Sequence, residues 1–227
     1  MHIALRLASL LCTVFAACVV NQTCVYENGV PTCGPNYKAD PPFQPSIQTM
    51  TPPNMCPEFE GNPVCCFNYD NYQLITQFME LDYTFGGNNG GCDVCAANMK
   101  RFWCYFVCAP DQSDFLSIGN YTWVPNPISP GSLIQVLEIN FTITMELACG
   151  MYESCKKCPY TQEVSSMQSA EGFLQFQGTN SAIGGELITF FFLTQGTQGA
   201  LNINMAPCNY KKPELAGIPV SPCSCNK

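Results

Sequence analysis

The sequence predicts one α+β domain in which helices pack around a small mixed sheet and disulfide bridges hold the parts together. Three observations lead to this fold class. The chain has 17 cysteines in 227 residues, a density typical of exported, disulfide-rich domains. One predicted helix carries four of these cysteines between residues 92 and 108, and strand-like alternation follows in the second half of the chain. Because helical and strand patterns are mixed and no internal repeat or hinge divides them, we expect a single domain.

Residues 1–20 are typical of a secretory signal peptide. Arg6 precedes fourteen uncharged residues, Leu7 to Val20, and the small residues Ala16, Ala17 and Cys18 offer cleavage points. This run is too short for a membrane-spanning helix, which needs about 20 apolar residues; a buried core helix is the alternative. The mature domain is then expected over residues 21–227.

The signal peptide and the cysteines together predict an exported glycoprotein of the secretory pathway. Disulfide bridges persist in an oxidising lumen or outside the cell. Three Asn-x-Thr sequons, at Asn21, Asn120 and Asn140, are candidate glycosylation sites in the same compartment. We therefore expect an extracellular protein or one of the endosomal or lysosomal lumen.

Charge and histidine content exclude several classes of function. Nine basic and seventeen acidic residues give a formal charge of −8, which argues against nucleic acids and anionic membranes as main partners. His2 is the only histidine, so removal of a leader would leave no Ser-His, Cys-His or His-metal chemistry. The carboxylates are scattered and no phosphate-binding glycine loop is present. We expect no enzyme, no cofactor and no metal.

The first half of the mature chain divides into an irregular part and a helix. Residues 24–64 are rich in Pro, Gly and Asn, which predicts a long irregular crossing that needs disulfide bridges to hold it down. From Asn68 the pattern is helical, since Leu74, Phe78 and Leu81 follow at i, i+4 and i+7. The glycine-rich segment 86–91 ends this helix in a loop.

The next helix carries the apolar stripe Cys95, Met99, Phe102 and Phe106. Its cysteines at 92 and 95 point roughly opposite to those at 104 and 108. At a rise of 1.5 Å per residue, Cys95 and Cys104 lie about 13 Å apart along the axis, too far for four sulfurs to bind one zinc ion at about 2.3 Å each. The helix is therefore expected to be bonded to different neighbours on two sides. The C-x-x-C spacings at 92–95 and 155–158 also match a redox motif, a weak signal in so cysteine-rich a chain.

Further elements follow in the second half. The expected elements are a half-buried strand over 139–145, a helix through 149–155, a short segment at 171–176, an apolar strand over 187–193 and an alternating strand over 201–205. The run Phe190-Phe191-Phe192 beside Leu201, Ile203 and Met205 could wall an apolar ligand cavity. The alternative is that these side chains are simply core, and the pattern leaves both open.

The cysteine helix also resembles a known family. The residues that carry the resemblance are Cys92-x2-Cys95-x2-Asn98-x5-Cys104-x3-Cys108-Ala-Pro110-x-Gln112-Ser113-x-Phe115, with Asn21-Gln-Thr-Cys24-Val-Tyr26, Cys56-Pro57, Val64-Cys65-Cys66, Met151-Tyr152-Glu-Ser154-Cys155-Lys156 and Pro222-Cys223-Ser224-Cys225 in the same order. They resemble the N-terminal luminal domain of the Niemann–Pick type C sterol-transport family over nearly the whole mature chain.

The resemblance implies a sterol-binding module rather than an enzyme. Domains of that family bind cholesterol in a deep apolar pocket with the 3β-hydroxyl buried, and pass it between a small soluble carrier protein and the membrane. Carried over by motif, the hydroxyl end would be Asp70 by strict count, or Gln73 after a three-residue shift, with Asn98 and Asn36 as further polar candidates. The pocket wall would be Tyr26, Leu74, Trp103, Phe190, Phe191, Leu201 and Ile203. Phe173 and Leu174 would lie at the pocket mouth, where an exposed apolar patch would serve carrier docking.

The resemblance also implies a disulfide map. It would join Cys24 to Cys65, Cys56 to Cys104, Cys66 to Cys108, Cys92 to Cys223 and Cys95 to Cys155. Cys149 and Cys158 are additional to the family pattern and are expected to pair with each other. Cys208 and Cys225 lack their family partners unless they join each other. Cys33 matches half of a missing loop bridge, so it is either unpaired or bonded to Cys18.

Two other functions are open to an exported, disulfide-rich domain. One is a vitamin binder like the folate and riboflavin receptors, which stack flat rings on tryptophans; this chain has only Trp103 and Trp123. The other is a secreted structural or adhesive module with a solid core. A membrane-bound form is expected only if the chain continues beyond Lys227.

Overall fold

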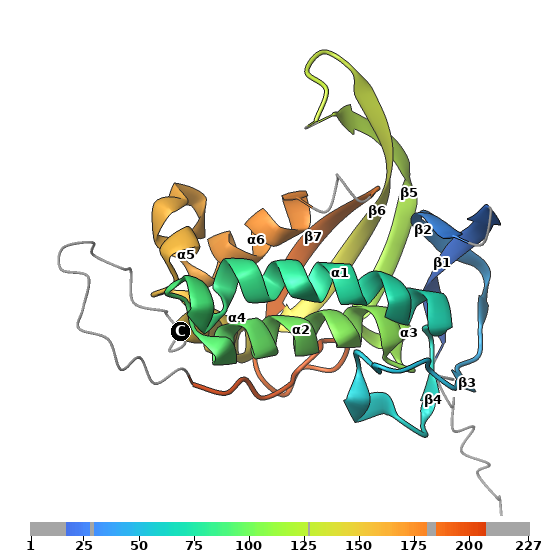
Figure 1. Cartoon of the computed structure of the whole chain (residues 1–227), viewed down its shortest axis with the longest axis horizontal. Helices are drawn as coiled ribbons and strands as arrows, with labels where there is room; N and C mark the ends of the chain where they lie inside the picture. The colour runs from blue at the N-terminus through green and yellow to red at the C-terminus, as the bar shows by residue number, and fades with distance from the viewer. Residues whose placement is uncertain (1–16, 28–29, 127, 181–184, 208–227) are drawn as a thin grey trace, which may run out of the picture.

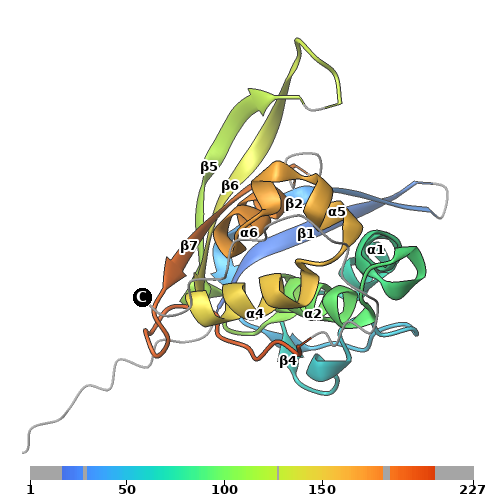
Figure 2. The ribbon, with the colours of Figure 1, turned by 90° about the vertical axis from the view of Figure 1, so that its left-hand side faces the viewer.

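A layer of helices covers one face of a three-stranded sheet, and a two-stranded hairpin lies beside them (Figures 1 and 2). The computed structural model describes residues 17–27, 30–126, 128–180 and 185–207. The longer elements are β1 (Cys18–Glu27), β2 (Val30–Phe43), α1 (Asn68–Phe85), α2 (Asp93–Cys108), β5 (Leu116–Pro125), β6 (Leu133–Thr144), α4 (Met145–Cys155), α6 (Ala170–Asn180) and β7 (Glu186–Leu193). The shorter ones are β3 (Ser46–Ile47), β4 (Pro63–Val64), α3 (Gln112–Phe115), α5 (Pro159–Glu163) and the 3₁₀ turns η1 (Pro57–Phe59), η2 (Gly87–Asn89) and η3 (Ser165–Met167). Together they form the α+β domain that the sequence predicts.

The two long helices form where periodicity predicts them. Leu74 and Phe78 are buried on α1, and the helix ends at Gly86, whose N–H still donates to Asp82 O. The stripe expected on α2, from Cys95 to Phe106, is almost completely buried. It faces the sheet because an apolar stripe of this width is removed from water only by packing against another apolar surface.

The main sheet is mixed, in the order β5-β6-β7. β5 and β6 pair antiparallel, whereas β6 and β7 pair parallel, with Phe141 opposite Phe190. Ile139, Phe141 and Ile143 are fully buried, and the intervening Asn140 and Thr142 are half-buried. The predicted alternation of the strand is thus confirmed. Beyond the helices the β5–β6 hairpin continues as a long projection (Figures 1 and 2).

The expected irregular crossing is wrong for its first part. Residues 18–43 form the antiparallel hairpin β1–β2. In its strand register, Cys24 lies opposite Cys33 and Gln22 lies opposite Asn36. Prolines in β2 obscured the pattern, but a two-stranded sheet has only edge strands, where a missing N–H is tolerated. The strand expected over 201–205 is also wrong: it is reduced to one bridge, between Leu201 and Ile143. The short segment at 171–176 proves to be part of helix α6.

Four disulfide bridges join the described residues. Three are those that the resemblance implies, namely Cys56–Cys104, Cys66–Cys108 and Cys95–Cys155, so α2 is bonded to different neighbours on two sides as its geometry predicts. The implied Cys24–Cys65 bridge is wrong, because Cys65 bonds to Cys18 with 5.3 Å between their Cα atoms. Cys18 is fully buried. Gln112 Oε1 accepts hydrogen bonds from the N–H groups of Val19 and Val20, so residues 18–20 belong to the folded domain.

The remaining cysteine expectations meet the structure only in part. Cys92 and Cys149 are disulfide-bonded, but the implied Cys92–Cys223 bridge and the Cys208–Cys225 alternative lie outside the described residues. Cys149 and Cys158 do not bond to each other, since Cys158 Sγ donates a hydrogen bond to Phe85 O at 3.5 Å. Within the described ranges, no helix is both long and apolar enough to cross a bilayer.

Candidate functional site

The first two turns of α1 contain both residues expected to meet a ligand hydroxyl. Asp70 is buried, and its Oδ2 accepts a hydrogen bond from Phe67 N–H at 2.6 Å. Burial raises the pKa of Asp70 to about 7, although N–H donors from Phe67 and Asp70 itself oppose the rise. Gln73 follows one turn later and is half-buried, on the same side of the helix because residues three apart are neighbours. Asp70 and Gln73 therefore form one polar position in an apolar setting.

Three stacked aromatic rings lie at the start of α1, two of them close in sequence to Asp70. The rings of Phe43 and Phe67 stack with centroids 5.8 Å apart, and Phe67 stacks on Tyr69 at the same distance. Burial and the negative charge of Asp70 raise the pKa of the Tyr69 hydroxyl to about 12. The side chains of Asn36 and Tyr26, expected nearby, lie outside the described ones. Rings beside a lone carboxyl give the apolar surroundings that a ligand with one hydroxyl requires.

The side-chain amide of Asn98 is hydrogen-bonded to the backbone of the protein itself. Its Nδ2 donates to Ala206 O at 2.8 Å and its Oδ1 accepts from Ala206 N at 3.1 Å. A side chain held this way fastens the segment after Leu201 to α2. The structure therefore gives Asn98 a structural role, and its expected contact to the ligand hydroxyl stays a prediction.

Helix α2 separates the expected wall residues into two groups. Leu74 packs with Phe78 and the Cys56–Cys104 and Cys66–Cys108 bridges. Phe190, Leu201 and Ile203 belong to the core on the other side, between α2 and the sheet. Trp103 is half-buried and packs against both groups. The wall expected as one surface is therefore split.

Aromatic rings fill the space between α2 and the sheet. Phe141 is their centre, with centroid distances of 5.1 Å to Phe102, 5.4 Å to Phe106 and Phe190, and 5.6 Å to Phe115. Pairs at these distances attract one another beyond the area they bury. For Phe190 and its neighbours, the core alternative left open by the sequence therefore describes this side of α2.

Three expected pocket residues need correction. Phe191 is 47% exposed, because successive side chains of a strand point to opposite faces and Phe190 takes the buried one. Phe173 and Leu174 are fully buried. Phe173 lies against Phe85 and Tyr152, with centroid distances of 6.0 and 6.3 Å. They form no exposed patch for a carrier.

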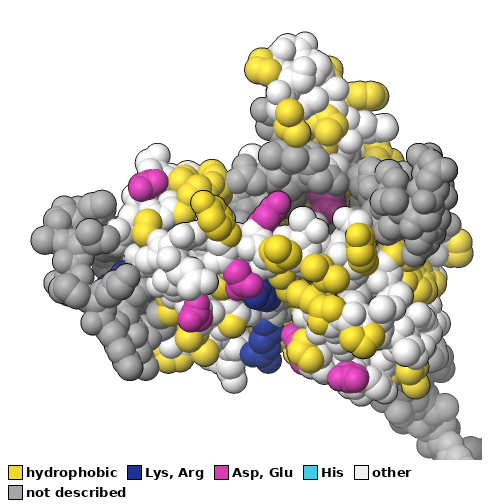
Figure 3. Space-filling model, in the orientation of Figure 1, with side chains coloured by type: hydrophobic (Ala, Val, Ile, Leu, Met, Phe, Trp, Pro, Cys, Tyr) yellow, Lys and Arg dark blue, Asp and Glu magenta, His cyan; other side chains and the backbone are white. Residues whose placement is uncertain are grey.

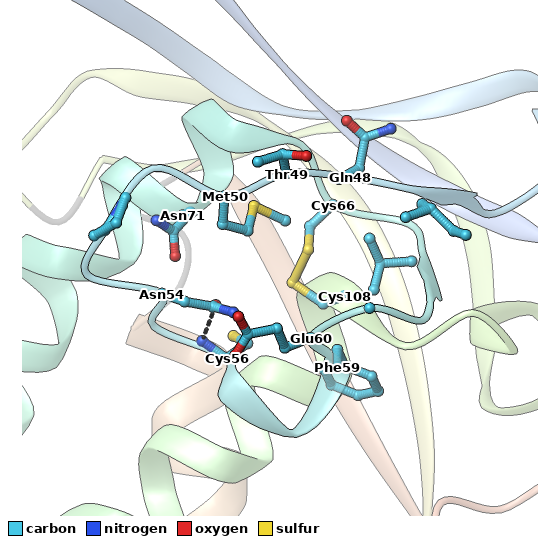
Figure 4. Close-up of a pocket in the computed structure, with 14 residues that line it drawn as sticks. Gln48, Thr49, Met50, Asn54, Cys56, Phe59, Glu60, Cys66, Asn71 and Cys108 are labelled. Atoms are coloured by element: carbon cyan, nitrogen blue, oxygen red, sulfur yellow. Dashed lines mark hydrogen bonds between the residues drawn. A yellow bond between two sulfur atoms is a disulfide. The ribbon is translucent and has the colours of Figure 1, made fainter.

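A cavity of about 330 Å³ lies elsewhere, under the loop from β3 to η1 (Figure 4). Its apolar lining includes Met50, Phe59, Val64 and the Cys66–Cys108 bridge, and its polar lining includes Asn54, Glu60 and Asn71. The Asn71 amide is already engaged with Met55 N, Thr51 O and Pro53 O. The volume is at the small end of the range for ligand pockets, about 300–1,000 Å³. Sequence reasoning missed it because irregular loops form it.

Buried polar atoms without a partner are a second feature that periodicity could not reveal. Tyr152 is completely buried on α4, yet its hydroxyl has no hydrogen-bond partner among the described residues, and the same holds for Thr161 Oγ1. Burial raises the pKa of Tyr152. An orphaned hydroxyl in a native core calls for an explanation such as water or a ligand. The only signal in the sequence is its place in the Met151–Cys155 motif.

The described side chains offer little for catalysis or metal binding. No group of three His, Cys, Asp or Glu residues in the described part of the chain could hold a metal ion. The ion pairs there are on the surface, such as Lys100–Asp82 and Lys156–Glu153, and Asp70 is in neither.

Comparison of the sequence with known proteins finds one protein family and several relatives. A family model described as "Niemann-Pick C1 N terminus" matches residues 12–227. The chain is 24% identical over 179 residues to "NPC intracellular cholesterol transporter 1 homolog 1" of Caenorhabditis elegans, which covers 74% of this chain and 12% of the relative.

Two vertebrate relatives show similar likeness. "NPC intracellular cholesterol transporter 1" of Sus scrofa is 25% identical over 159 residues, 70% of this chain and 12% of the relative. "NPC1-like intracellular cholesterol transporter 1" of Mus musculus is 27% identical over 193 residues, 75% of this chain and 14% of the relative. The chain thus spans only a small part of the length of these curated relatives.

Proposed function

The chain belongs to the Niemann-Pick C1 N-terminal family, and on that premise we propose that it binds cholesterol or a related sterol in a buried apolar site and takes part in sterol transport. The observation that carries the proposal is the family match across residues 12–227. The names of the relatives, which are cholesterol transporters, support the same ligand class. Binding and transfer, rather than catalysis, is the proposed activity.

The start of α1 is the proposed place for the sterol hydroxyl. Asp70 and Gln73 supply a carboxyl and an amide within one helical turn, and the Phe67 and Tyr69 rings supply apolar surroundings. A sterol has one hydroxyl on a rigid apolar skeleton, so one buried polar position is what it needs. With a pKa of about 7, the Asp70 carboxyl is mostly neutral at pH 5, where it can both donate to and accept from that hydroxyl. At pH 8 the carboxylate only accepts.

Saturable binding of radiolabelled cholesterol is the direct test. The protein is incubated with cholesterol in detergent micelles, with and without excess folate as competitor. We expect saturable uptake that folate does not reduce. A folded protein that takes up neither ligand would contradict the proposal and favour the structural or adhesive module; uptake of folate would favour the vitamin binder.

The place of the sterol hydroxyl is tested by combining one change in the ligand with single changes in the protein. An analogue lacking the 3β-hydroxyl should bind the natural chain about tenfold more weakly, because one net hydrogen bond contributes about 1–1.5 kcal/mol. This difference should shrink in Asp70→Leu or in Gln73→Leu, whichever residue holds the hydroxyl. Phe191→Ser is the matched control, since Phe191 is exposed and should leave the difference unchanged. If the difference survives in both α1 variants, the hydroxyl lies elsewhere, with Tyr152 as the next position to change.

Compartment and carrier are part of the same proposal. Four bridges between described residues support an oxidising compartment, the secretory pathway, the lysosomal or endosomal lumen or the cell exterior. A small soluble carrier protein remains a proposed partner. Because Phe173 and Leu174 are buried, such a carrier would have to use another surface.

A further inference from the structure

The β5–β6 hairpin beyond the helices, residues 121–126 and 128–135, is called the arm here, and it carries exposed apolar side chains. Trp123 is 62% exposed, Leu133 60% and Ile128 72%. The arm projects away from the helices in two perpendicular views (Figures 1 and 2), and hydrophobic side chains are visible along it in the space-filling view (Figure 3). Large apolar groups on a projecting element are unusual on a soluble protein and indicate a contact surface.

The strand register collects these side chains on one face. Tyr121, Trp123 and Pro125 alternate along β5, and their β6 partners are Leu137, Gln135 and Leu133 in that order. Directly paired residues project to the same side of a sheet. Tyr121, Trp123, Pro125 and Leu133 therefore form one apolar stripe that ends at the tip, next to Ile128.

Charge is absent from this part of the chain. Between Asp114 and Glu138 the sequence has no Asp, Glu, Lys or Arg, although the whole chain carries a formal charge of −8. A charged side chain costs several kcal/mol near the middle of a bilayer, so an uncharged arm is compatible with an apolar medium. It also provides no cation to attract anionic headgroups.

Four backbone N–H groups in the described part of the tip are hydrogen-bonded within it. Asn126 N–H donates to Ser132 O and Ser132 N–H to Ser129 O, at 3.0 and 3.2 Å. Asn126 Oδ1 accepts from Ile128 N–H at 2.9 Å and from Ser129 N–H at 3.2 Å. Prolines at 127 and 130 have no N–H to satisfy. Turns exposed to water often have such bonds as well, but here they leave fewer polar groups to lose water if the tip enters lipid.

We propose that the arm is a membrane-contact element whose tip, with Ile128 and Leu133, enters the interfacial layer of an uncharged lipid bilayer. A projecting ridge fits a flat, deformable bilayer, whereas a protein partner would need a matching groove. Interfacial elements enter by about 5–10 Å, and at about 3.4 Å per residue Trp123 is about 7 Å from Pro125 along β5. Trp123 would thus lie at headgroup depth, where tryptophan is favoured, and a glycan at Asn120 would stand a further 10 Å or so back.

Tryptophan fluorescence with sterol-free phosphatidylcholine vesicles tests the proposal independently of sterol binding. The signal of Trp123 is the difference between the natural chain and Trp123→Phe. We expect it to shift to shorter wavelength with vesicles and to be quenched by lipids brominated near the headgroup. Co-sedimentation of Ile128→Ser/Leu133→Ser with the vesicles should be at least about tenfold weaker, because two apolar side chains no longer leave water.

The matched control is Met79→Ser/Tyr83→Ser on α1. These two side chains are as exposed as those of the arm, but Asp82 and Glu80 lie beside them, so vesicle binding should not change. Equal loss in both variants, binding only to anionic vesicles, or no binding at all would overturn the proposal. So would a protein that is a dimer through the arm and a monomer in Ile128→Ser/Leu133→Ser. Near-ultraviolet dichroism and cholesterol uptake, both expected to be unchanged, show that each variant is folded.

Discussion

At the scale of single residues, two effects on the charge of the Asp70 carboxyl oppose each other. Its carboxylate oxygen accepts the hydrogen bond from Phe67 N–H at the start of α1, a position where negative charge is favoured by the helix dipole. Its burial disfavours that same charge, and burial is the larger effect, since the pKa rises from 3.8 to about 7. The folded protein therefore binds a proton at Asp70 that the unfolded chain has already lost at pH 5.

This difference predicts a stability that falls as the pH rises. Between pH 3.8 and about pH 7 the folded state holds more protons at Asp70 than the unfolded state, so the free energy of unfolding decreases with pH. The expected decrease from pH 5 to pH 7 is about 2 kcal/mol, and little further change from this group is expected above pH 8. Urea unfolding at several pH values measures it. Asp70→Asn should remove this contribution while keeping an acceptor for Phe67 N–H; an unchanged slope in Asp70→Asn would show that other groups cause it.

At the scale of one strand, β7 places two neighbouring phenylalanines on opposite faces, one buried and one exposed. Phe190 contacts Phe102 and Phe141 in the core, whereas Phe191 projects to solvent. We expect Phe190→Ala to lower the free energy of unfolding by about 3–5 kcal/mol, the usual cost of removing a buried phenylalanine. Phe191→Ala should change it by less than about 0.5 kcal/mol. Chemical denaturation of both variants checks this, and similar losses in the two would mean that the outer face of β7 is covered.

At the scale of the amino-terminal hairpin, the Cys18–Cys65 bridge has a consequence for processing. A leader cut after residue 20, as predicted from its apolar run, would remove Cys18 and leave Cys65 without this partner. We therefore expect cleavage before Cys18, at the small residues Ala16 or Ala17. Sequencing of the mature amino terminus and a non-reducing peptide map would show Cys18 linked to Cys65. A map that links Cys65 to Cys24 would instead restore the pairing implied by the family.

Helices with strong periodicity could be predicted from the sequence, whereas the pairing of strands with one another could not. Leu74, Phe78, Met99 and Phe102 repeat at helical spacing, so α1 and α2 follow directly. Residues 18–43 lack alternation and contain several prolines, so nothing local indicates that β1 and β2 form a hairpin. Leu201 and Ile203 do alternate. Of these two residues, Leu201 makes backbone hydrogen bonds to β6, through Thr144 N–H and Thr142 O, whereas Ile203 is in no strand. Strand formation depends on a neighbour as well as on the pattern.

The candidate site shows the same limit. Periodicity correctly makes Leu74 and Phe190 buried, but it contains no information on which side of α2 each one packs. The consecutive pair Phe173-Leu174 could as well be a mouth as a core, and the packing of α6 against α4 and β7 decides for the core. Asn98 matches the family position, yet only coordinates reveal that Ala206 occupies its amide. Residue identity alone thus indicates a site but not its contacts.

At the scale of the whole molecule, α2 is the part to which the rest is fastened. Three of the four bridges described here start from it and lead to Cys56, Cys66 and Cys155. Two of them hold the loop-rich segment from β3 to Cys66, which has its own cavity and little regular structure. The third holds α4, which follows directly on the central strand β6. Covalent bonds thus join the loop-rich segment and the well-packed helix α4 to α2.

Reduction should therefore disrupt the fold and sterol binding together. Each bridge contributes roughly 2–4 kcal/mol, though not additively, and a whole domain is stable by only about 5–15 kcal/mol. We expect excess dithiothreitol to abolish near-ultraviolet dichroism and saturable cholesterol uptake at the same reductant concentration. Cys95→Ser/Cys155→Ser and Cys56→Ser/Cys104→Ser, compared as single-bridge variants, should each lose only part of the stability. A fully reduced chain that kept its dichroism and its ligand would mean that the aromatic core alone specifies the fold and that the bridges are dispensable.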